Sequence, residues 1–256
     1  MPAFDGGLAY KIVTDELGSD KFASFDETPI AAASLGQVHL AVTAAGERVA
    51  VKVQRPSLKE LIDCDLQNLK VLAEILYRLD TSPDSMLRDW REIFASNARI
   101  IYEEIDYTLE ASNGQKFASN FEQYPWVKVP RVYPELTSTK VLTMEYVPGI
   151  KISDVGELRA QGFSTSDLAR QSGESFMIQL LRHGYFHCDP HPGNIAVDAN
   201  GPNGAARLIY YDFGMVDTLS EDFRRALVDG FFALYESKPK ELVQALIDGE
   251  MLGGKV

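Results

Sequence analysis

Residues 186–194 read FHCDPHPGN, and the triplet DFG, residues 212–214, begins eighteen residues after the last Asn of this stretch. Asp189 and Asn194 lie five residues apart, and Asp212 supplies a second carboxylate. Phosphoryl transfer uses such groups: one Asp receives the proton of an attacking hydroxyl or orients a water, while an Asn and a second Asp hold magnesium against the phosphates. The two stretches therefore indicate magnesium-dependent phosphate chemistry.

The spacing of these residues is that of a kinase catalytic loop. The interval from Asp189 to Asn194 equals the Asp-to-Asn interval of H-R-D-L-x-x-x-N, and DFG matches the kinase triplet. Asp189 is the predicted catalytic residue, and Asn194 and Asp212 are the predicted ligands of Mg²⁺. Taken alone, a DFG arises by chance, and the loop could be a turn packed by its two prolines. His187 is interpreted as a hydrogen-bonding residue behind the metal turn.

An upstream lysine supplies a third part of the pattern. Residues 49–52 read VAVK, the strand in which the ammonium of a lysine meets the nucleotide phosphates and pairs with a helical Glu. Lys52 is therefore a second predicted catalytic residue. The three motifs occur in the kinase order, and their conjunction predicts a site for ATP or ADP with Mg²⁺.

Two further segments make the resemblance specific. An alanine-rich loop, residues 29–39, precedes the lysine strand, and residues 104–113 read EIDYTLEASN. With the HCDPHPGN loop, they resemble the UbiB/ADCK family of atypical kinases from about residue 15 to at least residue 217. The resemblance implies an α+β, bilobal protein-kinase-like fold: a first lobe, residues 1–148, of a small sheet with inserted helices, and a mainly helical second lobe, residues 149–256.

The alanine-rich loop departs most from ordinary kinases. Glycine lets backbone amides approach a phosphate closely and adopt positive φ, and each alanine methyl removes both freedoms. The alanines either pack in a tight strand turn or form a modified phosphate-covering loop, and the resemblance favours the second interpretation. It implies that the nucleotide contacts residues of this loop and of the adjoining strands: Ala31, Ala32, Ala33, Ser34, Gly36, Val38, Ala50 and Lys52.

Residues 144–149, MEYVPG, stand where kinases link their lobes. Met144 is expected to line the back of the adenine pocket. The backbone around Glu145 and Val147 is expected to offer the acceptor and donor for the base. Pro148 and Gly149 place the predicted domain boundary here, because Pro and Gly end regular elements.

Three carboxylates of the EIDYTLEASN segment need separate partners. Glu110 lies six residues beyond Glu104, and six steps of about 100° put two helical side chains on different faces. By resemblance, Glu110 pairs with Lys52. Glu104 and Asp106 form the family's regulatory Glu-x-Asp pair, in which Glu104 receives a lysine from an N-terminal extension that the resemblance implies is missing here. The alternative is that all three belong to a solvated helix face.

Leucines at intervals of three and four predict a helix from residue 57 onward, and residues 87–121 predict a second, with Pro83 between them. Both apolar stripes are expected to face the core; they comprise Leu66, Leu69, Leu72, Leu76 and Leu79, and then Trp90, Phe94, Ile101, Ile105 and Leu109. A Ser or Thr among residues 164–166 is expected to cap a helix that ends at Gly184. Residues 195–210 are expected to form a hairpin that delivers Asp212.

The composition argues against a nucleic-acid partner, a membrane-spanning helix and a disulfide framework. The formal net charge of the 256 residues is −12, so nucleic acid is not an expected partner. No apolar run is long enough to span a bilayer. Cys64 and Cys188 are too few for a disulfide framework.

The phosphoryl acceptor is inferred from departures from ordinary protein kinases, and the cellular location from the family resemblance. After DFG a helix is expected almost at once, near Ser220, and no Ala-Pro-Glu follows, so a small molecule, a lipid-like head group or water is favoured over a polypeptide. The resemblance implies an ATPase or phosphotransferase supporting prenylquinone metabolism (ubiquinone, plastoquinone or tocopherol), with prenyl-lipid or membrane-associated quinone-pathway proteins as partners. A plastid location (plastoglobule or thylakoid) or a cyanobacterial-type cytoplasm is favoured, with the mitochondrion as the alternative. The competing hypothesis is a nucleotide-binding pseudokinase regulator with little turnover.

Overall fold

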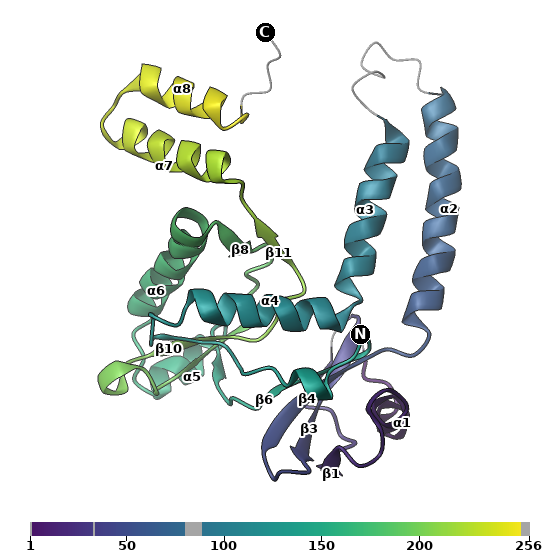
Figure 1. The fold of residues 1–256 in the computed structure, drawn as a ribbon. Coiled ribbons are helices and arrows are strands. Elements are labelled where there is room, and N and C mark those ends of the chain that lie inside the picture. The colour runs from purple at the N-terminus through teal and green to yellow at the C-terminus, as the bar shows by residue number, and fades with distance from the viewer. Residues whose placement is uncertain (1, 33, 80–88, 252–256) are drawn as a thin grey trace. The chain divides into compact units, whose positions relative to one another are not determined.

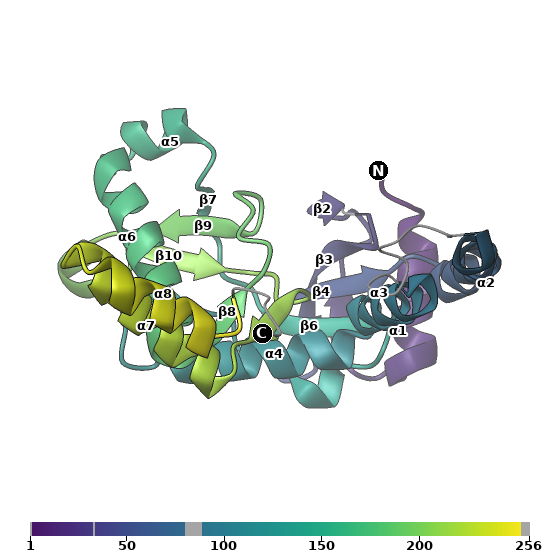
Figure 2. The same cartoon turned by 90° about the horizontal axis from the view of Figure 1, so that it is seen from above.

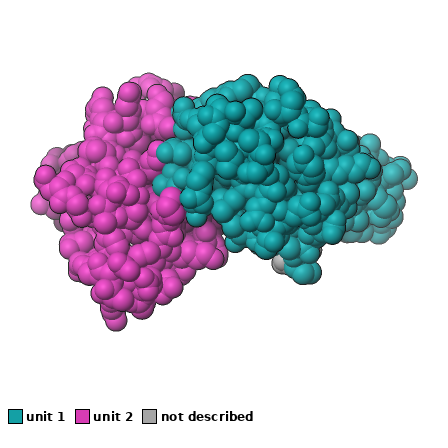
Figure 3. Space-filling view, turned by 90° about the horizontal axis from the view of Figure 1, so that it is seen from below, with its two compact units in different colours: residues 1–115, 130–147 teal, residues 116–129, 148–256 magenta. Residues whose placement is uncertain are grey.

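The computed structural model describes residues 2–32, 34–79 and 89–251. The chain divides into two compact units, one of residues 1–115 and 130–147, the other of residues 116–129 and 148–256 (Figure 3). Each unit has its own core, and each combines helices with a sheet. The predicted α+β class is confirmed.

The first unit is built on an antiparallel sheet with the strand order β1-β3-β4-β6. Its strands are β1 (Phe22–Phe25), β3 (Gly36–Thr43), β4 (Arg48–Gln54) and β6 (Val141–Glu145), and the short β2 (Ala31–Ala32) pairs with β3. The β3–β4 connection is a tight turn in which Thr43 N–H donates to Glu47 O, with Gly46 at a φ of 86°. Lys52 lies in register with Val38 on one side and Leu142 on the other.

The two faces of β4 serve different purposes. Side chains alternate along a strand, so Val49, Val51 and Val53 share one face while Ala50 and Lys52 share the other. The three valines are fully buried against α1 (Gly6–Leu17), whose Ala9 and Val13 pack in the same cluster. Burying such a side chain contributes about 1.5–3 kcal/mol, so this face anchors the sheet. The opposite face is left for the lysine.

Helices α2 (Leu58–Leu79) and α3 (Trp90–Glu104) lie side by side (Figures 1 and 2). The expectation that their stripes face a core is wrong for most of the first stripe. Leu66 is buried, but Leu69, Leu72, Leu76 and Leu79 are exposed, and none of the described residues of α3 is buried. In the second stripe Trp90, Phe94 and Ile101 are half-buried, Ile105 is buried and Leu109 is exposed. Periodicity identifies an apolar face and not its partner, and these two helices contact chiefly each other. Pro83, the expected break, lies outside the described residues.

The stretch expected to be one helix over residues 87–121 is two. Helix α3 ends at Glu104, and α4 (Tyr107–Asn120) starts after Asp106, whose Oδ1 accepts from Thr108 N–H at 2.9 Å. An Asp at this place favours a new helix start, because its carboxylate satisfies an amide that has no partner within the helix. Ile105 and Tyr107 at the junction are buried.

The second unit contains a four-stranded sheet in the order β5-β10-β9-β7 and a two-stranded pair, β11-β8. The strands are β5 (Val127–Lys128), β7 (Ile150–Lys151), β8 (Tyr185–His187), β9 (Ile195–Asp198), β10 (Arg207–Tyr210) and β11 (Val216–Thr218). The predicted hairpin is confirmed, with Ile195 opposite Tyr210 and Val197 opposite Leu208. The unit therefore holds more strand than the sequence indicates.

The helices that follow in this unit are α5 (Val155–Ala160), α6 (Thr165–Met177), the π-helical η3 (Ile178–His183), α7 (Glu221–Tyr235) and α8 (Pro239–Asp248), and single 3₁₀ turns are η2 (Pro134–Leu136) in the first unit and η4 (Pro202–Gly204) in the second. Leu158 of α5 and Leu168 of α6 are buried in the second core, and Ile178 of η3 packs against it, whereas α7 contacts η3 and α8. As predicted, Ser164 caps α6, its hydroxyl accepting from Asp167 N–H at 3.3 Å, and Gly184 ends η3 at a φ of 61°. Within the part of the chain that the structure describes, no helix is both long and apolar enough to cross a membrane.

Candidate active site

In the first unit, Lys52 on β4 and Glu110 in the first turn of α4 form a two-point ion pair. Lys52 Nζ lies 2.7 Å from Glu110 Oε1 and 2.8 Å from Oε2. The side chains are 14% and 3% exposed, so water screens the pair little. A carboxylate near a helix N-terminus also gains from the helix dipole. The pair expected from the resemblance is therefore present, with the ammonium held in one place by its partner.

Tyr107 lies beneath this pair. Lys52 Nζ is 5.0 Å from the centroid of its ring, and Tyr107 is 1% exposed. Its N–H donates to Thr139 O at 3.2 Å, which fixes the start of α4 to the segment that leads into β6. A Cβ at Gly36 would lie 2.6 Å from Tyr107 Oη and 2.5 Å from Val53 O. The one glycine kept in the alanine-rich loop is thus required by its close approach to the backbone of β4 at Val53 and to this tyrosine.

The alanine-rich loop adopts extended structure. Ala31 and Ala32 form β2, opposite Val38 and Gln37 of β3, and both alanines are exposed. Packing of their methyl groups therefore does not account for these two residues. Ala33, also expected at the nucleotide, lies outside the described residues.

Arg55 fixes the far end of the loop. Its Nε donates to Ser34 O at 2.8 Å, and its backbone N–H donates to Leu35 O at 2.9 Å. The loop is therefore bonded to β3 at one end and to the end of β4 at the other.

The residues expected around the base lie on neighbouring strands. Ala50 is directly opposite Met144, both are 8% exposed, and Val38 packs against the same cluster. Glu145 N–H donates to Arg131 O at 2.7 Å, and Glu145 Oε2 accepts from Arg131 N–H at 3.0 Å. The strand end that precedes Val147 is thereby fixed.

The two carboxylates predicted to be regulatory lie at the junction of α3 and α4. Glu104 is the last residue of α3, and Asp106 bonds to the first turn of α4. Glu110 is 4% exposed, which excludes the interpretation that all three carboxylates belong to a solvated face.

In the second unit, His187 at the end of β8 connects the catalytic loop to the DFG turn. Its Nδ1 accepts from Asp189 N–H at 3.0 Å, so the ring proton is on Nε2, which donates to Asp212 O at 2.8 Å. Burial lowers the pKa of His187, which keeps the imidazole neutral for both bonds. The predicted hydrogen-bonding place of His187 behind the metal turn is confirmed.

The loop itself is held by its own backbone. His191 N–H donates to Asp189 O at 2.7 Å, and Asn194 N–H donates to His191 O at 2.9 Å. Tyr211 N–H then donates to Asn194 O at 3.1 Å, which fixes Asn194 beside the residue preceding Asp212. The structure thus brings the predicted base and both predicted metal ligands together in one turn system.

The candidate ligand set suits magnesium. Asn194 and Asp212 are half-buried and Asp189 is exposed, while Phe213 points into the core. Among the described residues, no group of three or more His, Cys, Asp or Glu side chains gathers to hold an ion. Magnesium usually keeps several of its waters and binds to proteins through one or two carboxylates together with phosphates of the substrate. A set of one Asp and one Asn is therefore typical of a site for magnesium nucleotide.

Two residues of the site were not predicted from the sequence. Tyr107 stands three residues before Glu110, the spacing of one helix face, and this spacing could have identified it. Gln179, whose side chain bonds to the backbone of His187 at 2.9 Å, has no local signal, because the bond joins residues eight apart across a helix end.

Comparison with known proteins agrees with this geometry. Residues 1–246 match the ABC1 atypical kinase-like domain family. The chain is 49% identical over 251 residues to "Protein ACTIVITY OF BC1 COMPLEX KINASE 8, chloroplastic" of Arabidopsis thaliana, covering 96% of this chain and 32% of that protein. It is 36% identical over 251 residues to "Probable protein kinase UbiB" of Pseudomonas fluorescens, covering 97% of this chain and 46% of that protein.

A solved structure extends the comparison to three dimensions. The structure of Rv3197 from Mycobacterium tuberculosis, described as a complex with erythromycin, has a TM-score of 0.76 and 26% identity to this chain, covering 100% of this chain and 63% of that one. The chain therefore spans 32% and 46% of the length of the two curated relatives.

Proposed function

The chain belongs to the ABC1 atypical kinase-like family, and from this premise we propose that it binds ATP or ADP with Mg²⁺ and that it hydrolyses ATP or transfers its phosphoryl group to a small molecule or lipid. The observation that carries the proposal is the buried Lys52–Glu110 pair, at 2.7 and 2.8 Å. Kinase catalysis requires this pairing, because it holds the ammonium where it meets the phosphates. The predicted membership of the UbiB/ADCK family is confirmed by the same comparisons.

Lys52 contributes a fixed positive charge. An ammonium bonded to phosphate oxygens makes charge-assisted hydrogen bonds, about twice as strong as neutral ones. Glu110 and the ring of Tyr107 leave it few orientations, so little entropy is lost when nucleotide binds. Around the base, Met144, Ala50 and Val38 supply an apolar wall.

The second unit contributes the proton acceptor and the metal ligands. Asp189 is the group that receives the hydroxyl proton of an acceptor or orients water, and Asn194 and Asp212 are the residues that would hold Mg²⁺. Bound Mg²⁺ would neutralise charge on the phosphates. Neutral His187 keeps the backbones of Asp189 and Asp212 in fixed places, because it bonds to both.

The acceptor is proposed to be small or lipid-like. After Gly214 the chain enters β11 at Val216 and α7 at Glu221, which leaves no segment of the length that presents a peptide in protein kinases. A plastid location is supported by the chloroplastic relatives from Arabidopsis. A role in prenylquinone metabolism, with prenyl-lipid or quinone-pathway proteins as partners, is proposed from the resemblance to the UbiB/ADCK family.

A regulatory pseudokinase is the second candidate, and the alanine-rich loop favours it. Ala31 and Ala32 are paired to β3 as a strand, so their backbone amides lack the freedom that glycine gives a phosphate loop. Such a protein would bind nucleotide and turn over little.

Release of phosphate from ATP, with Mg²⁺ and with chelator, separates the two candidates. An enzyme releases phosphate only with Mg²⁺, and Lys52→Met abolishes the release. The matched control is Lys59→Met, because Lys59 forms an exposed pair with Asp63 at 2.8 Å and lies outside the site. Nucleotide binding without release would support the regulator, and neither binding nor release would contradict both.

A further inference from the structure

The helix that leads to the catalytic loop ends in an unusual turn. Residues Ile178–His183 form a π-helix, η3, and Gly184 N–H donates to Gln179 O, five residues earlier. π turns are rare and occur frequently at functional sites, because they move a side chain out of the regular helical register. The strand that follows, β8, ends at His187, so the π turn lies immediately before the catalytic loop.

Both ends of the Gln179 side-chain amide form hydrogen bonds. It is 1% exposed, its Oε1 accepts from His187 N–H at 2.9 Å, and its Nε2 donates to Ser175 Oγ at 3.3 Å. Ser175 Oγ is also 2.9 Å from Tyr210 Oη. The backbone amide of His187 can only donate, so it fixes which end of the Gln179 amide points toward it. A buried network of this kind stabilises one arrangement when all its members are satisfied.

This network joins the two segments that carry the candidate catalytic groups. Gln179 holds β8, and Tyr210 is the last residue of β10, two residues before Asp212. The ring of His187 then bonds to Asp189 N–H and to Asp212 O. The side chain of Gln179 therefore bonds directly to His187, and His187 in turn bonds to the backbones of Asp189 and Asp212.

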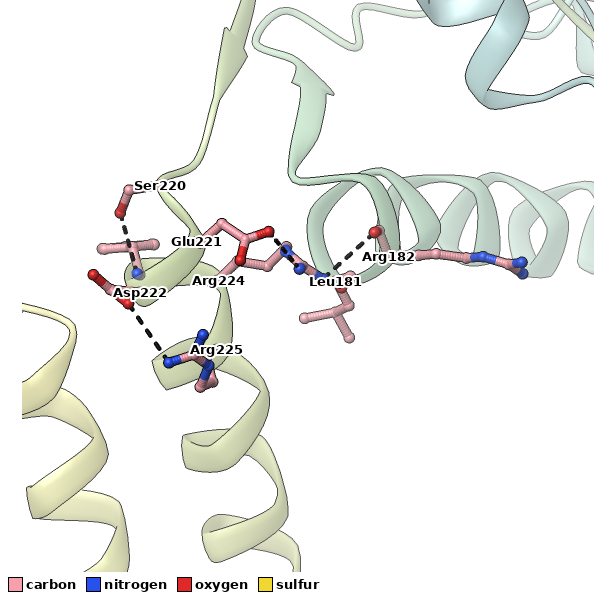
Figure 4. Close-up of polar contacts among 8 residues, drawn as sticks. Leu181, Arg182, Ser220, Glu221, Asp222, Arg224 and Arg225 are labelled. Carbon is pink, nitrogen blue, oxygen red and sulfur yellow. Dashed lines mark hydrogen bonds and ion pairs between the residues drawn. The ribbon is translucent and has the colours of Figure 1, made fainter.

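The other end of the π turn is fixed by α7 (Figure 4). Arg224 Nη1 donates to Leu181 O at 3.1 Å and to Arg182 O at 3.5 Å. These are carbonyls at a helix end, which have no partner within the helix. Leu219 N–H donates to Gly184 O at 2.7 Å, and a Cβ at Gly184 would lie 3.0 Å from Arg224 Cδ. The turn is thus held from both sides.

We infer that Gln179 is a positioning residue for the candidate phosphoryl-transfer site: through His187 it sets the places of Asp189 and Asp212, and the π turn is the device that presents it. The inference rests on the proposed function. Residues that orient metal ligands through a hydrogen bond typically change metal affinity or activity by 10–100-fold when replaced. Gln179 bonds to the backbone of His187, whose ring bonds to one proposed metal ligand, Asp212, and to the proposed proton acceptor, Asp189.

The test compares two members of the network. Gln179→Met keeps the length of the side chain and removes the acceptor for His187 N–H, whereas Ser175→Ala keeps that acceptor and removes the partner of the Gln179 amide. Gln161→Met, at an exposed glutamine bonded to Glu157 at 2.9 Å, is the surface control. For each, three quantities are measured well below the melting temperature: apparent Mg²⁺ affinity with nucleotide, kcat for phosphate release, and ATP affinity in chelator.

Gln179→Met is expected to lower Mg²⁺ affinity and kcat by roughly 10–100-fold and to leave ATP affinity in chelator unchanged, since Lys52 lies in the other unit. Ser175→Ala is expected to lower the melting temperature and to lower Mg²⁺ affinity less than Gln179→Met does, because the acceptor for His187 N–H remains. The ¹⁵N shifts of the His187 ring report the same difference without turnover.

Wild-type Mg²⁺ affinity in Gln179→Met, or an equal loss in Ser175→Ala, would overturn the inference and leave the proposed function standing. An unchanged protein that binds no magnesium nucleotide would overturn the proposed function and this inference with it.

Discussion

At the scale of single residues, the ion pair of Lys52 and Glu110 balances the cost of removing two charges from water against their mutual attraction. Both side chains are largely buried, and the two charged groups lie 2.7 Å apart. Breaking a buried pair by removing one charge is strongly destabilising, because the remaining charge stays buried without its partner. The Lys52–Glu110 pair therefore affects both stability and the candidate nucleotide site.

Replacing Glu110 by Gln tests this directly. We expect the free energy of unfolding to fall by about 3 kcal/mol, the order found for breaking a buried pair, measured by urea denaturation at neutral pH. Asp63→Asn, which breaks the exposed pair with Lys59, is the control and is expected to change little. Equal effects of the two variants would show that water screens the Lys52–Glu110 pair as well as it screens a surface pair.

Asp212 is the proposed carboxylate ligand of Mg²⁺. Asp212→Asn removes the negative charge that would face the ion, so the extra rise in melting temperature that Mg²⁺ gives with nucleotide is expected to disappear. Asp217→Asn is the control, because Asp217 is an exposed carboxylate that bonds to Thr218 N–H at 2.7 Å. A magnesium effect of the same size in Asp212→Asn would remove this residue from the metal site.

His39 gives the first unit a dependence on pH. Gln37 Nε2 donates to His39 Nε2 at 3.0 Å, so Nδ1–H donates to Asp26 O at 2.7 Å and the ring is neutral. Burial lowers the pKa of His39 below its ordinary value of 6.5, against the smaller opposing effects of Asp26 and Glu27. As the pH falls through 6.5, the unfolded chain takes up the proton first, and the free energy of unfolding falls until the folded-state pKa is passed.

The contribution of His39 is measured as the slope of unfolding free energy between about pH 7.5 and pH 5.5. His39→Gln is expected to have a shallower slope, since it removes one of the groups that bind a proton on unfolding. His183 and His187, whose pKa values are also lowered by burial, supply the remainder. His191→Gln, at an exposed histidine, is the control, and identical slopes in all three proteins would contradict the account.

At the scale of elements, the sequence predicted helix ends correctly where neighbouring residues alone determine them. Ser164 caps α6 and Gly184 ends the helix because a hydroxyl bonded to a helical amide and a left-handed glycine need no distant partner. The leucine stripe of α2 was misinterpreted, since what covers a helix face depends on other elements. The π turn was missed because Gln179 reaches β8 through a tertiary bond that no local pattern encodes.

The short strand β2 allows the phosphate-loop hypothesis to be tested. If the methyl of Ala32 keeps the loop from covering ATP phosphates, Ala32→Gly is expected to favour ATP over ADP by about 1 kcal/mol, the net value of one hydrogen bond. A small loss of melting temperature, equal with and without nucleotide, is also expected, because glycine adds entropy to the unfolded chain.

Ala45→Gly, in the β3–β4 turn, is the matched control for the entropic effect. Calorimetric titration gives both affinities. If the ratio of ATP to ADP affinity is unchanged in Ala32→Gly, the alanine at this position is not a nucleotide filter.

At the scale of the whole molecule, the kinase-like fold predicted from three short motifs is confirmed by the family match and by the similarity to a solved relative. Motif order carried this prediction, because Lys52, Asp189 and Asp212 occur in the order in which kinases carry the corresponding residues. The networks around them could not be predicted. Tyr107 under Lys52 and Gln179 behind His187 depend on packing between segments that lie far apart or across helix ends.

The central claim is that this chain is a magnesium-dependent nucleotide-binding protein. Titration of ATP into the unchanged protein by calorimetry, once with Mg²⁺ and once with chelator, tests it most directly. The account predicts saturable binding at one site that is tighter with Mg²⁺, and a loss of that binding in Lys52→Met but not in Lys59→Met. Absence of ATP binding under both conditions, in a protein that melts cooperatively, would contradict it.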